Sequence, residues 1–138
     1  MVGSDDGEQP LLLVLDHHHR TSSSPFRMLQ DDNDANPWIE VDLVNSTVVS
    51  GVVTQGENYW VVTQYKVEYK KQPTSKWQNV TDGNGNTKLF IGNNQVELNA
   101  PVTNLFDESV VATVVRIVPT KRINGVALRL EFLGCRLG

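Results

Sequence analysis

The sequence predicts an all-β protein, a sandwich or barrel of about eight antiparallel strands. Three observations support this prediction. From Trp38 onward, the chain reads as one short strand after another. Clusters of turn residues separate these strands, and no segment of the sequence shows a convincing 3.6-residue apolar period. Residues 1–37 differ from the rest because they are polar and irregular.

The first two predicted strands lie between residues 38 and 55. Residues 38–43 (WIEVDL) alternate apolar and polar side chains, which is typical of a half-buried strand. Residues 47–55 (TVVSGVVTQ) are rich in β-branched side chains, which favour strands. Gly51 interrupts this run, so we expect a bulge or a close approach of two backbones there.

The third predicted strand, 64–71 (QYKVEYKK), alternates cleanly, which places Tyr65, Val67 and Tyr69 on one face. A strong turn signal, DGNGN, follows at 82–86. The same pattern resembles the start of a calcium-binding EF-hand loop, but its sixth and twelfth positions do not fit, and a hairpin turn explains it better. The remaining strands are expected at 76–82, 88–92, 102–106, 112–120 and 125–134.

Length and composition exclude several classes of protein. At 138 residues and 15.4 kDa, the chain is long enough for one domain with a core and too short for two ordinary ones. The net charge of −4 argues against a general nucleic-acid binder. The longest apolar run, 11–15, is too short for a membrane span or a signal-peptide core. We expect a leader or a disordered segment at 1–10 and a single domain at 11–138.

Seven motifs then occur in the order and spacing of a known family. They are PWIEVDL, GVVTQG, Trp60 followed by TQYKVEY, KLFIGN, PVTNLF, VVRIVPT and NGVALRLEFLGC. This series, which covers residues 38–135, resembles a discoidin domain, also called the coagulation factor five/eight type C domain. The resemblance implies a distorted jelly-roll β-barrel of the galactose-binding-like kind. It also implies a secreted or extracellular module whose loops at one end bind sugars, phospholipid head groups, collagen or other proteins.

The cysteine content departs from this family. The resemblance implies a disulfide between a cysteine at the start of the domain and the one in the final LGC motif, but Cys135 is the only cysteine of the chain. The barrel core must therefore supply the stability alone. We expect Cys135 to be either buried and inert or linked to a second chain, so the protein is a monomer or a disulfide-linked dimer.

The best candidate ligand site is the loop that contains Asn58, Tyr59 and Trp60. Two adjacent aromatic rings at a turn can stack on a sugar or enter a membrane interface. The alternative is that Trp60 folds back into the barrel. The resemblance implies a ligand-binding carboxylate before the Trp38 strand, which here points to Asp32 and Asp34, although an acidic loop at that position can also simply be solvated.

Cationic side chains give further candidates. Lys121 and Arg122 are expected in the turn before the last strand, at the same end as the aromatic loop. There they contact a phosphate or a carboxylate-bearing sugar, or they are simply solvated charges. His17 and His19 fall in the first loop of the family if residues 21–30 align with its serine-rich segment, and they then touch ligand. No second cluster of ligand residues accompanies them, so no metal site is predicted.

Strand arginines and glycosylation sequons complete the candidates. Arg116 and Arg129 lie inside strand patterns and are expected to be structural, with Arg129 paired to a carboxylate such as Asp42. Asn45 and Asn79 begin sequons for N-linked glycosylation, which is consistent with secretion.

The sequence predicts a binding protein and not an enzyme. No motif for nucleophilic, metal-dependent or nucleotide-dependent catalysis is present, and the three histidines are consecutive. No cofactor is predicted, although the resemblance admits a structural calcium ion because some sugar-binding relatives carry one. Recognition of cell-surface or microbial glycans is the leading hypothesis. Binding to anionic phospholipid membranes and protein–protein adhesion through the same loops are the alternatives.

Overall fold

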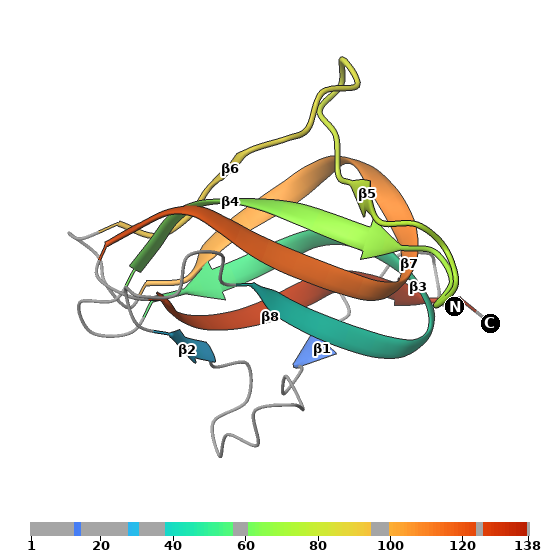
Figure 1. Ribbon diagram of the computed structural model, residues 1–138, viewed down its shortest axis with the longest axis horizontal. Coiled ribbons are helices and arrows are strands. Elements are labelled where there is room, and N and C mark those ends of the chain that lie inside the picture. The colour runs from blue at the N-terminus through green and yellow to red at the C-terminus, as the bar shows by residue number, and fades with distance from the viewer. Residues whose placement is uncertain are drawn as a thin grey trace.

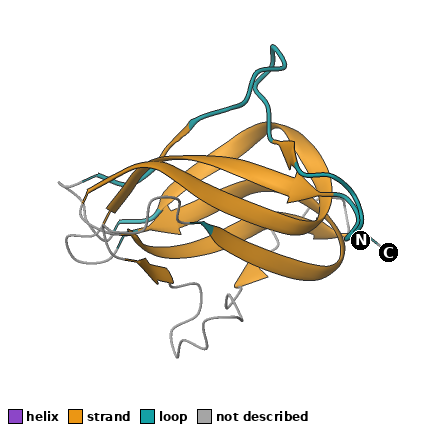
Figure 2. Ribbon diagram, in the orientation of Figure 1, coloured by secondary structure: helices purple, strands orange, loops and turns teal. Residues whose placement is uncertain are grey.

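The computed structural model describes residues 13–14, 28–30, 38–56, 61–94, 100–123 and 126–137. Within these ranges the chain consists of strands and loops (Figure 2). They contain no helix with the length and apolar character needed to cross a membrane. The all-β prediction is confirmed. The expected leader at 1–10 lies outside the described residues, and the division of the chain at residue 10 stays a prediction.

The described part of the chain contains eight strands, and four of them form the body of the barrel (Figure 1). The strands are β1 (Leu13–Val14), β2 (Met28–Gln30), β3 (Ile39–Gln55), β4 (Val61–Lys70), β5 (Gln78–Asn79), β6 (Phe90–Ile91), β7 (Val102–Ile123) and β8 (Val126–Arg136). Their order in the sheet is β1-β8-β3-β7-β4-β5, with β2 on β8 and β6 on β4. All pairings are antiparallel.

Two strands are longer than the sequence pattern indicates. The predicted strands 38–43 and 47–55 are the two halves of β3, which has 17 residues, and the predicted strands 102–106 and 112–120 lie within β7, which has 22. Shifts in the β3–β7 register interrupt the pairing where the pattern suggested breaks. A bulge lets a strand bend and continue, so local irregularity in the sequence did not mean that the strand ended.

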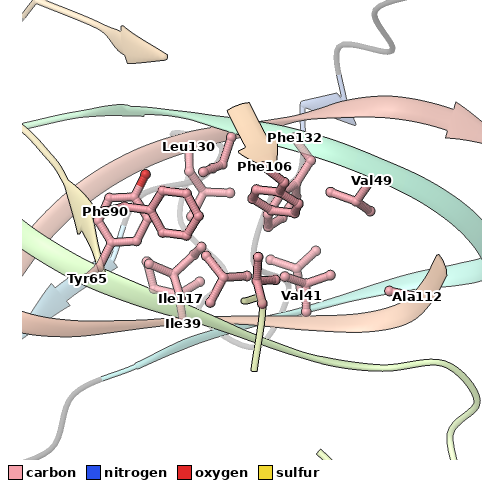
Figure 3. Packing of buried hydrophobic residues seen from close by; sticks show 14 of the residues in the cluster. Ile39, Val41, Val49, Tyr65, Phe90, Phe106, Ala112, Ile117, Leu130 and Phe132 are labelled. Carbon is pink, nitrogen blue, oxygen red and sulfur yellow. The ribbon is translucent and has the colours of Figure 1, made fainter. Parts of the chain in front are cut away.

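The core lies inside the curved sheet and follows the predicted alternation. Tyr65 and Val67 are fully buried, and Tyr69 packs partly buried against the same cluster, so their shared face is confirmed. The Tyr65 ring stacks on Phe90, with 5.4 Å between ring centroids, and Phe90 meets Phe106 at 5.6 Å (Figure 3). Apolar side chains from β3, β7 and β8 fill the rest of this space.

On the opposite face of the sheet, Arg116 lies between two tryptophan rings, an arrangement that we call the arginine stack. The sequence predicted a structural role for Arg116 but not these partners. The Arg116 guanidinium carbon lies 4.2 Å from the centroid of the Trp38 ring and 4.1 Å from that of Trp77. Its Nε donates to Glu40 Oε1 at 2.9 Å, and its Nη1 lies 3.8 Å from Glu68 Oε1. Two indole faces and two carboxylates thus hold one cation, which joins β3, β7 and β4 across the outer surface.

The expected pairing of Arg129 with Asp42 is wrong. In the strand register, Arg129 lies opposite Gln55 and Asp42 lies opposite Val114, so the two residues belong to different parts of β3 and its neighbours. The Asp42 carboxylate instead accepts a hydrogen bond from the Val44 backbone amide at 2.8 Å. Among the residues that the structure describes, the ion pairs of an arginine with strand carboxylates are those of Arg116.

The predicted turn at 82–86 forms the tip of a hairpin that projects from the barrel between β5 and β6 (Figure 1). Asp82 Oδ1 accepts hydrogen bonds from the backbone amides of Asn84 and Asn86 at 2.8 and 3.0 Å. Gly85 has a φ of 85°, a conformation that glycine adopts without steric cost. The Asp82 carboxylate therefore shapes the turn, as expected for a hairpin in preference to an EF-hand loop.

Gly51 lies where two backbones approach closely, as predicted. A β-carbon at this position would lie 2.7 Å from the Asn104 carbonyl oxygen, whereas one at Gly83 would meet nothing within 4 Å. We therefore expect Gly51→Ala to lower the free energy of unfolding by about 1–3 kcal/mol. Gly83→Ala, the matched control, should change it by less than about 1 kcal/mol. Urea unfolding measures both, and equal effects of the two substitutions would contradict this account.

Candidate functional site

Four long strands begin or end together at one end of the barrel. β3 ends at Gln55, β4 begins at Val61, β7 ends at Ile123 and β8 begins at Val126. The register confirms that these positions are neighbours, because Val61 pairs with Ile123 and Gln55 pairs with Arg129. We call these four strand termini and the connections between them the loop end, which lies at the left of Figure 1.

A buried asparagine fastens the base of the loop end. Asn93 is 1% exposed, and its Oδ1 accepts a hydrogen bond from the Thr54 hydroxyl at 3.0 Å. Its Nδ2 donates to the carbonyl oxygens of Thr54 at 3.1 Å and Ala100 at 2.9 Å. One side chain thereby joins the end of β3 to the segments on either side of residues 95–99. No sequence pattern indicated this role, because Asn93 resembles an ordinary residue after a strand.

A tyrosine continues this polar network into the core. The Tyr65 hydroxyl accepts a hydrogen bond from Asn104 Nδ2 at 3.1 Å and also contacts the Thr54 side chain. Asn104 Nδ2 donates in addition to the Ile91 carbonyl at 2.9 Å. Burial raises the pKa of Tyr65 to about 12, and the hydrogen bonds with Asn104 and Thr54 offset only part of this effect. The tyrosine is therefore a neutral member of the network at ordinary pH.

Several predicted site residues lie outside the described residues. They are Asn58, Tyr59 and Trp60 in the connection from β3 to β4, Asp32 and Asp34 before β3, and His17 and His19 between β1 and β2. Their roles stay predictions. What the structure does establish is that the connection at 57–60 starts and finishes at the loop end, because both Gln55 and Val61 belong to it.

Lys121 and Arg122 do not lie in a turn as predicted. They belong to the last residues of β7, where Lys121 is exposed opposite Gln64 and Arg122 is half-buried opposite Val62. The strand continues past Pro119 because a register shift in the β4–β7 pairing accommodates this residue. Their expected position at the same end as the 57–60 connection is nevertheless correct, and the exposed Arg129 of β8 adds a third cation there.

No metal site is visible in the part of the chain that the structure describes. No group of three or more histidine, cysteine or acidic side chains in those ranges is placed to hold an ion. The structural calcium ion that the resemblance admits stays a prediction. Of the two sequon asparagines, Asn45 is exposed within β3, and Asn79 is half-buried in β5.

A family model described as the F5/8 type C domain matches residues 3–132. The chain belongs to this family. This chain is 35% identical over 105 residues to retinoschisin of Takifugu rubripes. The match covers 74% of this chain and 36% of retinoschisin. The chain is also 35% identical to lactadherin of Mus musculus over 106 residues, which cover 75% of the chain and 22% of lactadherin. The chain thus spans less than half of the length of these curated relatives.

Solved structures share the fold of this F5/8 type C domain. Discoidin II from Dictyostelium discoideum matches with a TM-score of 0.64 and 23% identity, over 76% of this chain and 39% of that one. The family 32 carbohydrate-binding module of NanJ from Clostridium perfringens, solved in complex with galactose, matches with a TM-score of 0.60 and 14% identity, over 92% of each chain. These likenesses confirm the predicted galactose-binding-like architecture.

The raised pKa of Tyr65 predicts a stability change at high pH. Below pH 10 the tyrosine is protonated in both the folded and the unfolded chain, so it contributes no pH dependence. Between pH 10 and about 12 the unfolded chain loses this proton first, so the free energy of unfolding should fall, by about 2–3 kcal/mol in total. Tyr65→Phe should remove this contribution and Tyr69→Phe should leave it, as measured by urea unfolding at each pH. An identical pH slope in Tyr65→Phe and wild type would contradict the assignment.

Proposed function

We propose that this F5/8 type C domain is a non-catalytic, extracellular binding module that recognises cell-surface or microbial glycans through its loop end. The observation that carries this proposal is the construction of that end. Four strand termini meet there, and the buried Asn93 side chain joins the end of β3 to Ala100, just before β7. Loops that start from fixed points lose less conformational entropy when they bind a ligand. Family membership and the fold shared with a galactose-bound carbohydrate module support the choice of ligand.

The proposed mechanism combines ring stacking with hydrogen bonds. The rings of Tyr59 and Trp60 stack on the apolar face of a pyranose. The carboxylates of Asp32 and Asp34 accept hydrogen bonds from the sugar hydroxyls, and the Asn58 amide donates and accepts them, which together select the orientation of the hydroxyls. His17 and His19 contact the same ligand if the segment between β1 and β2 belongs to the loop end.

A shallow site of this kind binds a single sugar weakly, and repeated sites raise the overall affinity. Cys135 bears on this point because a disulfide between two chains would supply a second site. Its half-buried side chain lies on β8, opposite Val48 of β3. The alternatives of a monomer and a disulfide-linked dimer both stay predictions.

Peripheral binding to anionic phospholipid is a second candidate function, and a specific observation favours it. The described part of the loop end carries Lys121, Arg122 and Arg129, although the whole chain has a net charge of −4. Lysine and arginine near a membrane surface each contribute about 1 kcal/mol of attraction to anionic lipid. The aromatic side chains of the 57–60 connection would then enter the interface.

The glycan proposal predicts a loss of saccharide binding when the Trp60 side chain is replaced by a small one. Trp60→Ala should weaken binding to a glycan array and to bacterial polysaccharides at least tenfold, because the stacking surface is removed. Leu137→Ala is the control, since Leu137 is an exposed apolar residue beyond the opposite end of β8. Absence of any saccharide signal for wild type, or an unchanged signal for Trp60→Ala, would refute the proposal.

The membrane alternative predicts vesicle binding that depends on the charge of the loop end and on salt. Sedimentation with phosphatidylserine vesicles should fall severalfold in Lys121→Ala and decrease with added salt, because exposed charges act through screened electrostatics. Lys76→Ala removes the same charge from an exposed position in the turn between β4 and β5 and should leave sedimentation unchanged. Equal sedimentation with phosphatidylcholine vesicles would exclude this function.

A further inference from the structure

A polar pocket of about 290 Å³ lies far from the loop end. It is open on one side and is lined by Tyr69 near the end of β4, by Asn79 of β5 and the following Thr81, and by Glu108 and Ser109 in β7. Tyr69 is eight residues along β4 from Val61, a distance of about 26 Å in an extended strand. The pocket therefore belongs to the opposite end of the barrel, at the right of Figure 1 where β5 lies.

Both functional residues of one glycosylation sequon line this pocket. In Asn79-Val80-Thr81, the first and third residues face the pocket, and Val80 between them is buried in the core at 1% exposure. The Val80 amide donates to the Val67 carbonyl at 2.8 Å, and the Val80 carbonyl accepts from the Lys88 amide at 3.0 Å. Alternation along an extended backbone that is held on both sides thus presents Asn79 and Thr81 together.

The Asn79 side chain has no structural use that explains it. Its Oδ1 is buried and has no hydrogen-bond partner in the described part of the chain. A buried acceptor without a donor lowers stability, and an apolar residue at this position would avoid that cost. Asn79 pairs through its backbone with Glu68, next to the arginine stack, but its amide takes no part in the ion pairs there.

We propose that Asn79 carries an N-linked glycan and that the pocket holds its first sugar, an N-acetylglucosamine. The inference rests on the extracellular location in the proposed function. In the modification, a bond forms between Asn79 Nδ2 and the anomeric carbon of the sugar. The bond from that carbon to the diphosphate of a lipid-linked oligosaccharide donor breaks, the lipid diphosphate leaves, and the amide releases one proton.

The pocket has the size and the chemistry for one sugar ring. Its volume is at the lower limit of the roughly 300–1,000 Å³ of small-molecule sites, which suits a single pyranose. The Tyr69 hydroxyl donates to Gln78 Oε1 at 2.8 Å, so the ring that lines the pocket is held in place. Lys71 and Glu108 supply a donor and an acceptor at the exposed edge for sugar hydroxyls.

The second sequon provides an internal comparison. Asn45 is exposed, and its neighbourhood in β3 has no strand partner in β7, because the register breaks between Asp42 and Thr47. Thr47, the third residue of that sequon, is fully buried and donates to the Asn45 carbonyl at 3.0 Å. A glycan on Asn45 would extend into solvent, whereas one on Asn79 would be covered by its own domain.

The experiment uses the chain secreted from mammalian cells behind an added signal peptide, with glycopeptides identified by mass spectrometry. We expect Asn79 to be occupied. Peptide N-glycosidase should release its glycan at least tenfold more slowly from the native protein than from the denatured protein, because the attached sugar lies in the pocket. Glycan on Asn45, where present, should be released quickly from both. Tyr69→Leu and Glu108→Ala should each speed the native release at Asn79.

Two results would overturn the proposal. If the Asn79 peptide of correctly secreted protein is unmodified, Asn79 is not a glycosylation site. If the glycan is released equally fast from native and denatured protein, its first sugar does not lie in the pocket. Asn79→Gln controls for folding, since it should still be secreted with an unchanged circular dichroism spectrum. Protein made in bacteria, which lacks the modification, tests saccharide binding at the loop end separately, so failure of that function is distinguishable from failure of this one.

Discussion

The pairing of β3 with β7 is the constraint on which the rest of the structure depends. The first half of β3 pairs with the part of β7 that also pairs with β4, and the second half pairs with both β7 and β8. A straight ribbon could not supply edges to both sides of a closed barrel. Register shifts between Asp42 and Thr47, and between Val49 and Gly51, allow the bend. Because the two strands run nearly the whole length of the molecule, their ends also decide where the loop end forms.

Two polar arrangements stabilise this framework in opposite environments. On the outer face, Arg116 is a charged group that stays near water and lies between two indole rings. Inside, Asn93 and Tyr65 are neutral and satisfy their hydrogen-bonding atoms at fixed partners. This division follows the cost of burying charge, which is far higher than that of burying a neutral amide with its hydrogen bonds. The interior network joins the end of β3 to its neighbours without placing a permanent charge beneath the loop end.

The sequence correctly predicted the structural features that depend on residues close together along the chain. Alternation correctly placed Tyr65 and Val67 in the core, and the turn at 82–86 formed because Asp82 bonds to nearby amides. Features that depend on register between distant strands were missed or wrong. Nothing local distinguishes Arg116 from Arg129, since only the alignment of β3, β7 and β4 brings two carboxylates to Arg116. For the same reason Asn93 gave no signal, because its partners lie 39 and 7 residues away.

Cys135 has a consequence that reaches beyond its position on β8. No disulfide can form within these 138 residues, because they contain one thiol, so the barrel that they form relies on its packing, its strand pairing and its polar contacts. Folding of a single chain of this sequence therefore includes no step in which an internal disulfide forms. The same native state should be reached in the reducing cytoplasm of a bacterial host as in an oxidising secretory compartment.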